Sequence, residues 1–163
     1  STYVQDKGTG LFRRTMYSYW KRSVPNPSML TFDAPFRETC TVRRSRTNTP
    51  MQALNLMNDP TYVEASKFLA HRMLIEGGPT MESRLTYGLR LVTARPPSSQ
   101  ELSYLRAATL RTIADFEANP DEASALLKEG EAPFDESTSP IELAAYSIVA
   151  SIILNLDETI TRE

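Results

Sequence analysis

The sequence predicts an all-α protein: an irregular helical bundle around a buried C-terminal helix, with a long ordered loop region at the N-terminus. Three observations support this fold class. Several helix starts follow one pattern, in which a capping side chain stands one residue before the helix, usually followed by proline. Glycine is scarce, with six against eleven prolines, which disfavours a sheet-rich fold full of tight turns. The last long helix is apolar on almost every side, as buried bundle helices are.

The length of 163 residues fits one domain with its own hydrophobic core. We expect a single helical domain over 1–163, made of a basic irregular arm (1–48) and a helical body (49–163). The chain opens abruptly at Ser1, and we expect it to be a piece of a longer protein. No run of about 20 apolar residues is present, so we expect no membrane insertion.

Charge is distributed unevenly along the chain. Residues 1–50 carry nine Lys and Arg against three Asp and Glu, whereas the remainder carries nine against 17. This asymmetry predicts that the basic arm packs against the acidic body or meets an anionic partner, and the first alternative is favoured. The pI of about 5.5 and the short basic run disfavour nucleic acid as that partner.

The arm contains one expected helix and one expected loop. Residues 13–23 predict a short helix, because Met16, Tyr19 and Trp20 share a face at helical spacing. Residues 28–48 show no helical period and are rich in threonine, which predicts a long ordered loop with room for one short strand.

The body consists of capped helices. The expected capping residues are Thr49, Asp59, Ser98, Asn119 and Ser139. The expected helices cover 50–57, 60–76, 81–93, 99–117, 120–129 and 140–156. A left-handed cap at the Gly77-Gly78-Pro79 run ends the second of these. Residues 130–138 are expected to form an exposed acidic loop.

Apolar periodicity identifies the core positions. The final helix, 140–156, leaves only a narrow polar stripe and is expected to form the centre of the bundle. The other core positions are expected to be Val63, Phe68, Leu69, Met73, Leu102, Leu105, Leu110, Ile113 and Phe116.

The stretch 28–60 concentrates the chemically informative side chains. The candidates for binding an anion or a partner are Arg37, Arg43, Arg44, Arg46 and Asn48. A guanidinium presents a planar fork of donors that suits carboxylates, sulfates and exposed carbonyls. Structural pinning of the loop by these arginines is favoured over binding a discrete anion. Asp33 and Glu38 are expected to be their ion-pair partners, and the alternative is an acid/base pair for glycoside cleavage.

The remaining reactive residues predict no chemistry. Cys40 is the single cysteine and His71 the single histidine, and nothing in the sequence brings them together as a nucleophile and its base. We expect Cys40 to be packed and inert and His71 to be a surface residue. No catalytic residue, metal site or cofactor is predicted. Seven of the 14 aromatic residues lie in the first 36 positions; they are expected to attach the arm to the body, and the alternative is a sugar-binding platform.

Several motifs resemble a known family. The runs 27–35, 37–40, 43–54 and 58–60, together with Arg90–Pro97 and the tail from Leu154, closely resemble a planctomycete-type module, the domain-of-unknown-function family fifteen-fifty-three. The resemblance extends over essentially the whole chain.

The resemblance implies a C-terminal module of large exported bacterial proteins, hence a periplasmic or extracellular location. Such proteins often carry a sister domain upstream and a cytochrome-c-like domain. The partners expected on this basis are the upstream domains of the same polypeptide, and a glycan is the alternative. The favoured function is a non-catalytic structural and interaction module whose arginine-rich loop pins the arm or docks a partner domain. The alternatives are part of an enzyme or binding module for complex polysaccharide and, third, an electron-transfer partner of the cytochrome-like domain.

Overall fold

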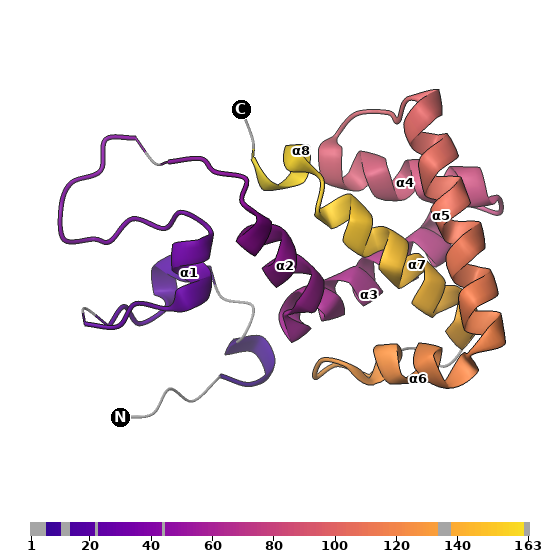
Figure 1. Ribbon diagram of the computed structural model, residues 1–163, viewed down its shortest axis with the longest axis horizontal. Coiled ribbons are helices and arrows are strands. Elements are labelled where there is room, and N and C mark those ends of the chain that lie inside the picture. Colours follow the sequence, from indigo (N-terminus) through magenta and orange to yellow (C-terminus); the bar gives the residue numbers. More distant parts are fainter. Residues whose placement is uncertain (1–5, 11–13, 22, 44, 134–137, 162–163) are drawn as a thin grey trace. The chain divides into compact units, whose positions relative to one another are not determined.

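A computed structural model describes residues 6–10, 14–21, 23–43, 45–133 and 138–161. These residues contain eight α-helices and no strand, which confirms the all-α class (Figure 1). The chain divides into two compact units, residues 1–55 and residues 56–163. Among the described residues, no helix combines the length and the apolar character needed to cross a membrane.

The first unit is mostly irregular. A 3-10 turn at Thr15–Tyr17 is the only helical structure in the described part of 13–23, so the predicted helix there is wrong. Met16 and Tyr19, which were expected to lie on its packed face, are largely exposed. Without burial of that face, little tertiary energy is available to offset the cost of ordering a short helix.

A short helix that the sequence analysis missed, α1 (Pro27–Thr31), opens the predicted loop. The side chain of Asn26 accepts a hydrogen bond from the N–H of Ser28 at 2.9 Å, and Pro27 occupies the first helical position. This is the same pattern of a capping residue followed by proline that marks the helix starts at Thr49 and Asp59. The pattern was therefore present here but hidden by the lack of apolar periodicity after it.

Helix α2 (Pro50–Asn58) spans the boundary between the units, and the second unit holds the remaining helices. These are α3 (Pro60–Glu76), α4 (Met81–Thr93), α5 (Ser99–Ala118), α6 (Pro120–Lys128), α7 (Pro140–Leu154) and α8 (Asp157–Ile160). All six predicted helices are present, with ends that differ by two residues at most. The predicted last helix is two residues too long, because Asn155 ends α7 and a separate helix follows.

Capping explains most of these starts. Thr49, Asp59 and Ser98 accept first-turn N–H groups as predicted, and Thr80 forms a further capping box with Ser83. The predicted side-chain caps at Asn119 and Ser139 are absent. The Asn119 amide instead donates backward to the carbonyl of Asp115 in α5, so it continues the end of one helix rather than opening the next.

The core of the second unit surrounds α7. This helix packs against α3, α4, α5 and α6 (Figure 1), and most of its side chains are buried, including Tyr146, Val149 and Ile153. Its predicted central position is therefore confirmed. Leu69, Met73, Leu105 and Phe116 are buried as expected, and Val63, Leu102 and Ile113 are partly buried. Phe68 and Leu110 were predicted to be in the core but are about half exposed.

Candidate functional site

The arginine-rich stretch forms a loop that is closed at its base. We call residues 34–46 the arginine loop, and Asp33 and Thr47 its neck. The Oδ2 of Asp33 accepts hydrogen bonds from both the N–H and the hydroxyl of Thr47, each at 2.8 Å. A carboxylate that accepts two donors from one residue fixes both the distance and the orientation of the two chain ends. The neck therefore closes the base of the loop.

Gln52, in the first turn of α2, fastens the neck to the helix. Its side chain is 1% exposed. The Nε2 donates to the carbonyl of Thr31 at 2.8 Å and to the hydroxyl of Thr47 at 3.1 Å. The Oε1 accepts from the N–H of Thr49 at 3.0 Å, which completes a capping box. One buried amide thus joins α1, the neck and α2.

Two residues of this region have left-handed backbone conformations that disfavour most side chains. Asp33 has φ 56° and Arg37 has φ 61°. Aspartate tolerates this conformation, but arginine adopts it rarely. The Arg37 guanidinium lies 5.1 Å from the centre of the Trp20 ring and donates to the carbonyl of Thr15 at 3.2 Å. These contacts stabilise the strained start of the loop through a cation–π interaction and a charge-assisted hydrogen bond.

The rest of the loop carries its side chains outward. Phe36, Cys40, Arg43 and Arg46 are exposed, and Val42 is fully exposed. Arg43 and Arg46 make no hydrogen bond or ion pair with any residue that the structure describes. Cys40 was expected to be packed, and this expectation is wrong because Cys40 and its neighbours in the loop are exposed.

The other predicted candidates have different positions. Glu38 and Asn48 are exposed, and Arg44 lies outside the described residues. Asp33 pairs with Thr47 and with no described arginine. His71 is partly buried on α3. The sequence missed Gln52 as the residue that fastens the neck, although its place in the capping box was visible.

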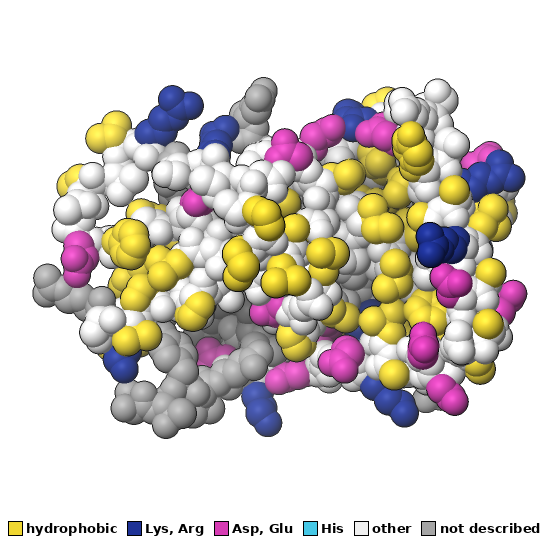
Figure 2. All heavy atoms as spheres, in the orientation of Figure 1, with side chains coloured by type: hydrophobic (Ala, Val, Ile, Leu, Met, Phe, Trp, Pro, Cys, Tyr) yellow, Lys and Arg dark blue, Asp and Glu magenta, His cyan; other side chains and the backbone are white. Residues whose placement is uncertain are grey.

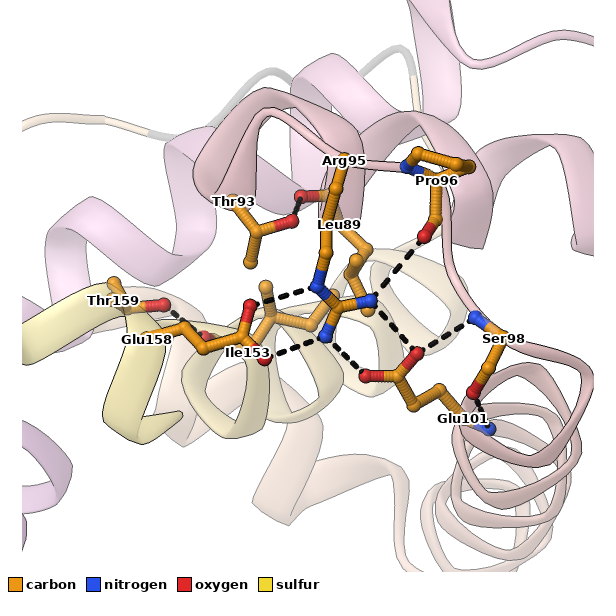
Figure 3. A network of polar contacts seen from close by, with 9 residues as sticks. All are labelled: Leu89, Thr93, Arg95, Pro96, Ser98, Glu101, Ile153, Glu158 and Thr159. Carbon is orange, nitrogen blue, oxygen red and sulfur yellow. Dashed lines mark hydrogen bonds and ion pairs between the residues drawn. The ribbon is translucent and has the colours of Figure 1, made fainter. Parts of the chain in front are cut away.

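A second polar network lies in the second unit (Figure 3). Arg95 stands between two carboxylates. Its Nη2 is 2.6 Å from Glu101 Oε1 and 2.7 Å from Glu158 Oε1. The hydrogen bond from Arg95 is the main cause that lowers the pKa of Glu101 to about 2, and it also lowers the pKa of Glu158. This network attaches α8 to the junction between α4 and α5.

Two buried charged residues of α3 hold the last turn of α6 and the segment that follows it. The Glu64 carboxylate accepts hydrogen bonds from the N–H groups of Glu131, at 2.6 Å, and Ala132, at 3.3 Å. The Lys67 ammonium donates to the carbonyls of Leu127 and Glu129. Burial lowers the pKa of Lys67. Because the Glu64 carboxylate and the Lys67 ammonium both have hydrogen-bond partners within the protein, this cluster is a structural clamp. The clamp cannot be recognised in the sequence, because its partners lie at least 60 positions apart along the chain.

No group of three or more His, Cys, Asp or Glu side chains within the described ranges is placed to hold a metal ion. The side chains of the arginine loop are instead suited to binding carboxylates or other anions, and its apolar side chains to packing against a second surface.

The chain was compared with known proteins. No curated protein and no solved structure matches it. A family model described as PSD1: Protein of unknown function (DUF1553) matches residues 1–109, which include the arginine loop, α1 to α4 and the first half of α5. The tail from Leu154, which also resembles the family, lies beyond the matched residues. The match confirms the resemblance, and the chain belongs to this family of proteins of unknown function.

Proposed function

We propose that the chain is a structural and interaction module of a larger exported bacterial protein, in which the arginine loop docks another domain of the same polypeptide. One observation carries this proposal: the loop is fastened at its neck while its arginines and apolar side chains remain exposed. A loop that only needed to be ordered would turn such side chains inward. Exposed functional side chains on a fixed frame are typical of binding loops.

The arginines divide into two roles. Arg37 stabilises the loop itself through Trp20 and Thr15. Arg43 directly follows the fully exposed Val42, and Arg46 lies three residues further along; both arginines are exposed and available to a partner. Arginine beside apolar side chains is a common composition for the residues that dominate protein–protein binding. The fastened neck also reduces the conformational entropy that the loop loses on docking.

Complex polysaccharide is the second candidate ligand, and exposed aromatic side chains favour it. Tyr17, Tyr19 and Phe36 are all largely exposed in the first unit. Aromatic faces beside guanidinium groups can stack on sugar rings and bind acidic substituents. The same exposed rings are equally suited to a protein surface, and the loop, fastened at its neck with its side chains exposed, favours that alternative.

Binding between the chain and the segment that precedes it in its native polypeptide tests the proposal. The two pieces would be produced separately and mixed, and their affinity measured by calorimetry. Replacing Arg43 and Arg46 with glutamate should weaken the complex at least about tenfold, because like charges then face the partner. The matched control is Arg111→Glu on α5, an arginine whose side chain is 85% exposed. If the glutamate variant of Arg43 and Arg46 binds the upstream segment as tightly as Arg111→Glu does, the loop is excluded as the docking element.

A further inference from the structure

We propose that a covalent bond closes the base of the arginine loop: the hydroxyl of Thr47 attacks the side-chain amide of Gln52, and an ester joins the two residues. The reaction releases ammonia. It lies entirely within the first unit, and it goes beyond the docking of a partner, which neither requires nor excludes it. The inference rests on four groups that the neck and the first turn of α2 bring together.

The first two groups are a nucleophile and its base. The hydroxyl of Thr47 donates a hydrogen bond to the Oδ2 of Asp33 at 2.8 Å. An alcohol is a weak nucleophile until a neighbouring base takes its proton, and a carboxylate within hydrogen-bond reach can do so. The N–H of Thr47 donates to the same oxygen, so the carboxylate is held against the hydroxyl. Asp33 is one of only three acidic residues in positions 1–55, and Figure 2 shows acidic side chains to be sparse over this part of the chain.

The third group is the electrophile, the carboxamide of Gln52. Its Nε2 lies 3.1 Å from the Oγ1 of Thr47. The amide carbon is one bond of about 1.33 Å from that nitrogen, so it lies within about 4.4 Å of the hydroxyl oxygen. A shift of about 1 Å brings the two atoms to the separation at which such additions begin. Gln52 is 1% exposed, so water has little access to compete with Thr47 for the amide carbon or to hydrolyse the ester.

The fourth group stabilises the charge that develops during the attack. The N–H of Thr49 donates to the Oε1 of Gln52 at 3.0 Å. This hydrogen bond polarises the carbonyl and strengthens as its oxygen becomes an oxyanion. The carbonyl of Thr31 accepts from the Nε2 at 2.8 Å, which together with the Thr49 bond fixes which end of the amide carries the oxygen. The carboxamide is therefore held in one orientation beside the hydroxyl.

The atoms balance without any further reactant. The Oγ1 of Thr47 forms a bond to the Cδ of Gln52, while its proton passes to Asp33. Asp33 then gives the proton to the amide nitrogen, the Cδ–Nε2 bond breaks, and ammonia leaves with the electron pair of that bond. An ester and a molecule of ammonia thus replace a hydroxyl and an amide. The ammonia is protonated in water and diffuses away, which prevents the reverse reaction.

The ester converts a hydrogen-bonded fastening into a permanent one. Hydrogen bonds at exposed positions open and re-form, whereas the ester keeps Thr47 attached to the first turn of α2. Asp33 still accepts the N–H of Thr47, so the neck stays closed. The link therefore fixes the C-terminal end of the arginine loop to the helix that follows it.

Intact-mass spectrometry of the purified chain tests the inference. After prolonged incubation at neutral pH, the chain should be lighter than its sequence requires by one molecule of ammonia. Trypsin cleaves after Arg46 and Lys67, so the loss should reside in the peptide of residues 47–67. Fragmentation of that peptide should yield no separate ions from breaks between Thr47 and Gln52, because the ester still joins the two pieces. An unchanged mass, or conversion of Gln52 to glutamate, would overturn the inference.

Variants identify the groups that react. Thr47→Val removes the hydroxyl and should abolish the loss of ammonia, whereas Thr47→Ser keeps a hydroxyl and should retain the loss. Thr41→Val is the matched control, since Thr41 is exposed in the arginine loop and belongs to none of the four groups; it should form the ester as the wild type does. Asp33→Asn keeps a hydrogen-bond acceptor but not the base, and it should slow the appearance of the ester at least about tenfold.

Ring closure at an asparagine also releases ammonia, and the same peptide contains Asn48, Asn55 and Asn58. Thr47→Val distinguishes the two reactions, because it leaves every asparagine in place. A loss of ammonia that persists in this variant would overturn the inference, as would an ester that forms equally fast in Asp33→Asn. None of these measurements involves the upstream segment, so failure of the inference leaves the proposed function to be decided by its own binding experiment.

Discussion

The carboxylate of Asp33 is bonded to Thr47 twice, through the backbone N–H and through the hydroxyl, across 14 positions of the chain. These contacts close the base of the arginine loop. Because Asp33 also has a left-handed backbone, its side chain and its conformation both serve the same closure. The neck is therefore the first place where the account can be tested.

Asp33→Ala should open the neck. The loss of two hydrogen bonds amounts to about 1–2 kcal/mol locally, so exchange of the Thr47 N–H measured by NMR should accelerate about tenfold or more. Asp33→Asn keeps an acceptor and a side chain that tolerates the left-handed backbone, and its exchange should stay closer to that of the wild type. Unchanged exchange in Asp33→Ala would show that the neck does not hold the loop.

Gln52→Leu should destabilise the first unit. The substitution keeps the bulk of the side chain but leaves the carbonyl of Thr31 and the N–H of Thr49 without their partner, at a cost of about 1–3 kcal/mol. Trp20, the only tryptophan, lies in this unit and reports its unfolding in urea by fluorescence. Met51→Ala, at the neighbouring exposed position, should change stability by less than about 0.5 kcal/mol. A similar loss of unfolding free energy in Gln52→Leu and Met51→Ala would contradict a central role for Gln52.

Arg95→Met should remove a pH-dependent part of the stability of the second unit. The pKa of Glu101 is lowered from 4.5 to about 2, so the folded state resists protonation more than the unfolded state does. The contribution is complete above pH 4.5 and is lost as pH falls toward 2. The stability difference between wild type and variant, measured by urea unfolding, should therefore narrow over that range.

The control for this pH series is Arg111→Met. Arg111 lies 3.9 Å from Asp115, and both side chains are exposed, so its replacement should have little effect at any pH. If the difference in unfolding free energy between wild type and Arg95→Met stays constant from pH 7 to pH 2, the carboxylate network is not the source of that difference.

Gly130→Ala should disrupt the clamp formed by α3. Gly130 has φ 92°, and a Cβ there would overlap the buried Oε2 of Glu64. Gly78→Ala is the control, because Gly78 has φ 93° but its Cβ would meet only the Ser83 hydroxyl at 2.9 Å. Both variants incur the backbone strain, and Gly130→Ala should lose about 1–3 kcal/mol more through the displaced carboxylate. If Gly130→Ala and Gly78→Ala lose the same stability, measured by thermal or urea unfolding, the Glu64 side chain can move aside without cost.

Local interactions made the helical body predictable. Caps such as Ser98 with Glu101 act over three residues, so the sequence shows both partners side by side. The buried α7 was predictable because its composition leaves no polar face. The prediction was wrong at 13–23, where the apolar spacing of a helix existed but Met16 and Tyr19 are largely exposed.

Long-range contacts could not be predicted. The sequence identified the arginine loop as the candidate site, but pairing Asp33 with Thr47 requires knowing that α1 and α2 approach each other. Glu64 and Lys67 were equally hidden, because their partners lie in the last turn of α6 and just after it. The exposure of Met51, Leu54 and Met57 on α2 also depends on what surrounds the helix, and an apolar stripe in sequence predicts burial by default.

The alkylation rate of Cys40 reports directly on whether the arginine loop docks against the upstream segment. This single cysteine is exposed on the arginine loop. Iodoacetamide should therefore modify it in the separate chain at close to the rate of an unhindered thiol, as followed by mass spectrometry. When the upstream segment of the native polypeptide is bound, docking of the loop should slow this reaction at least about tenfold, in line with the effect expected for the arginine variants. An unchanged rate in a complex known to have formed would contradict docking through the arginine loop.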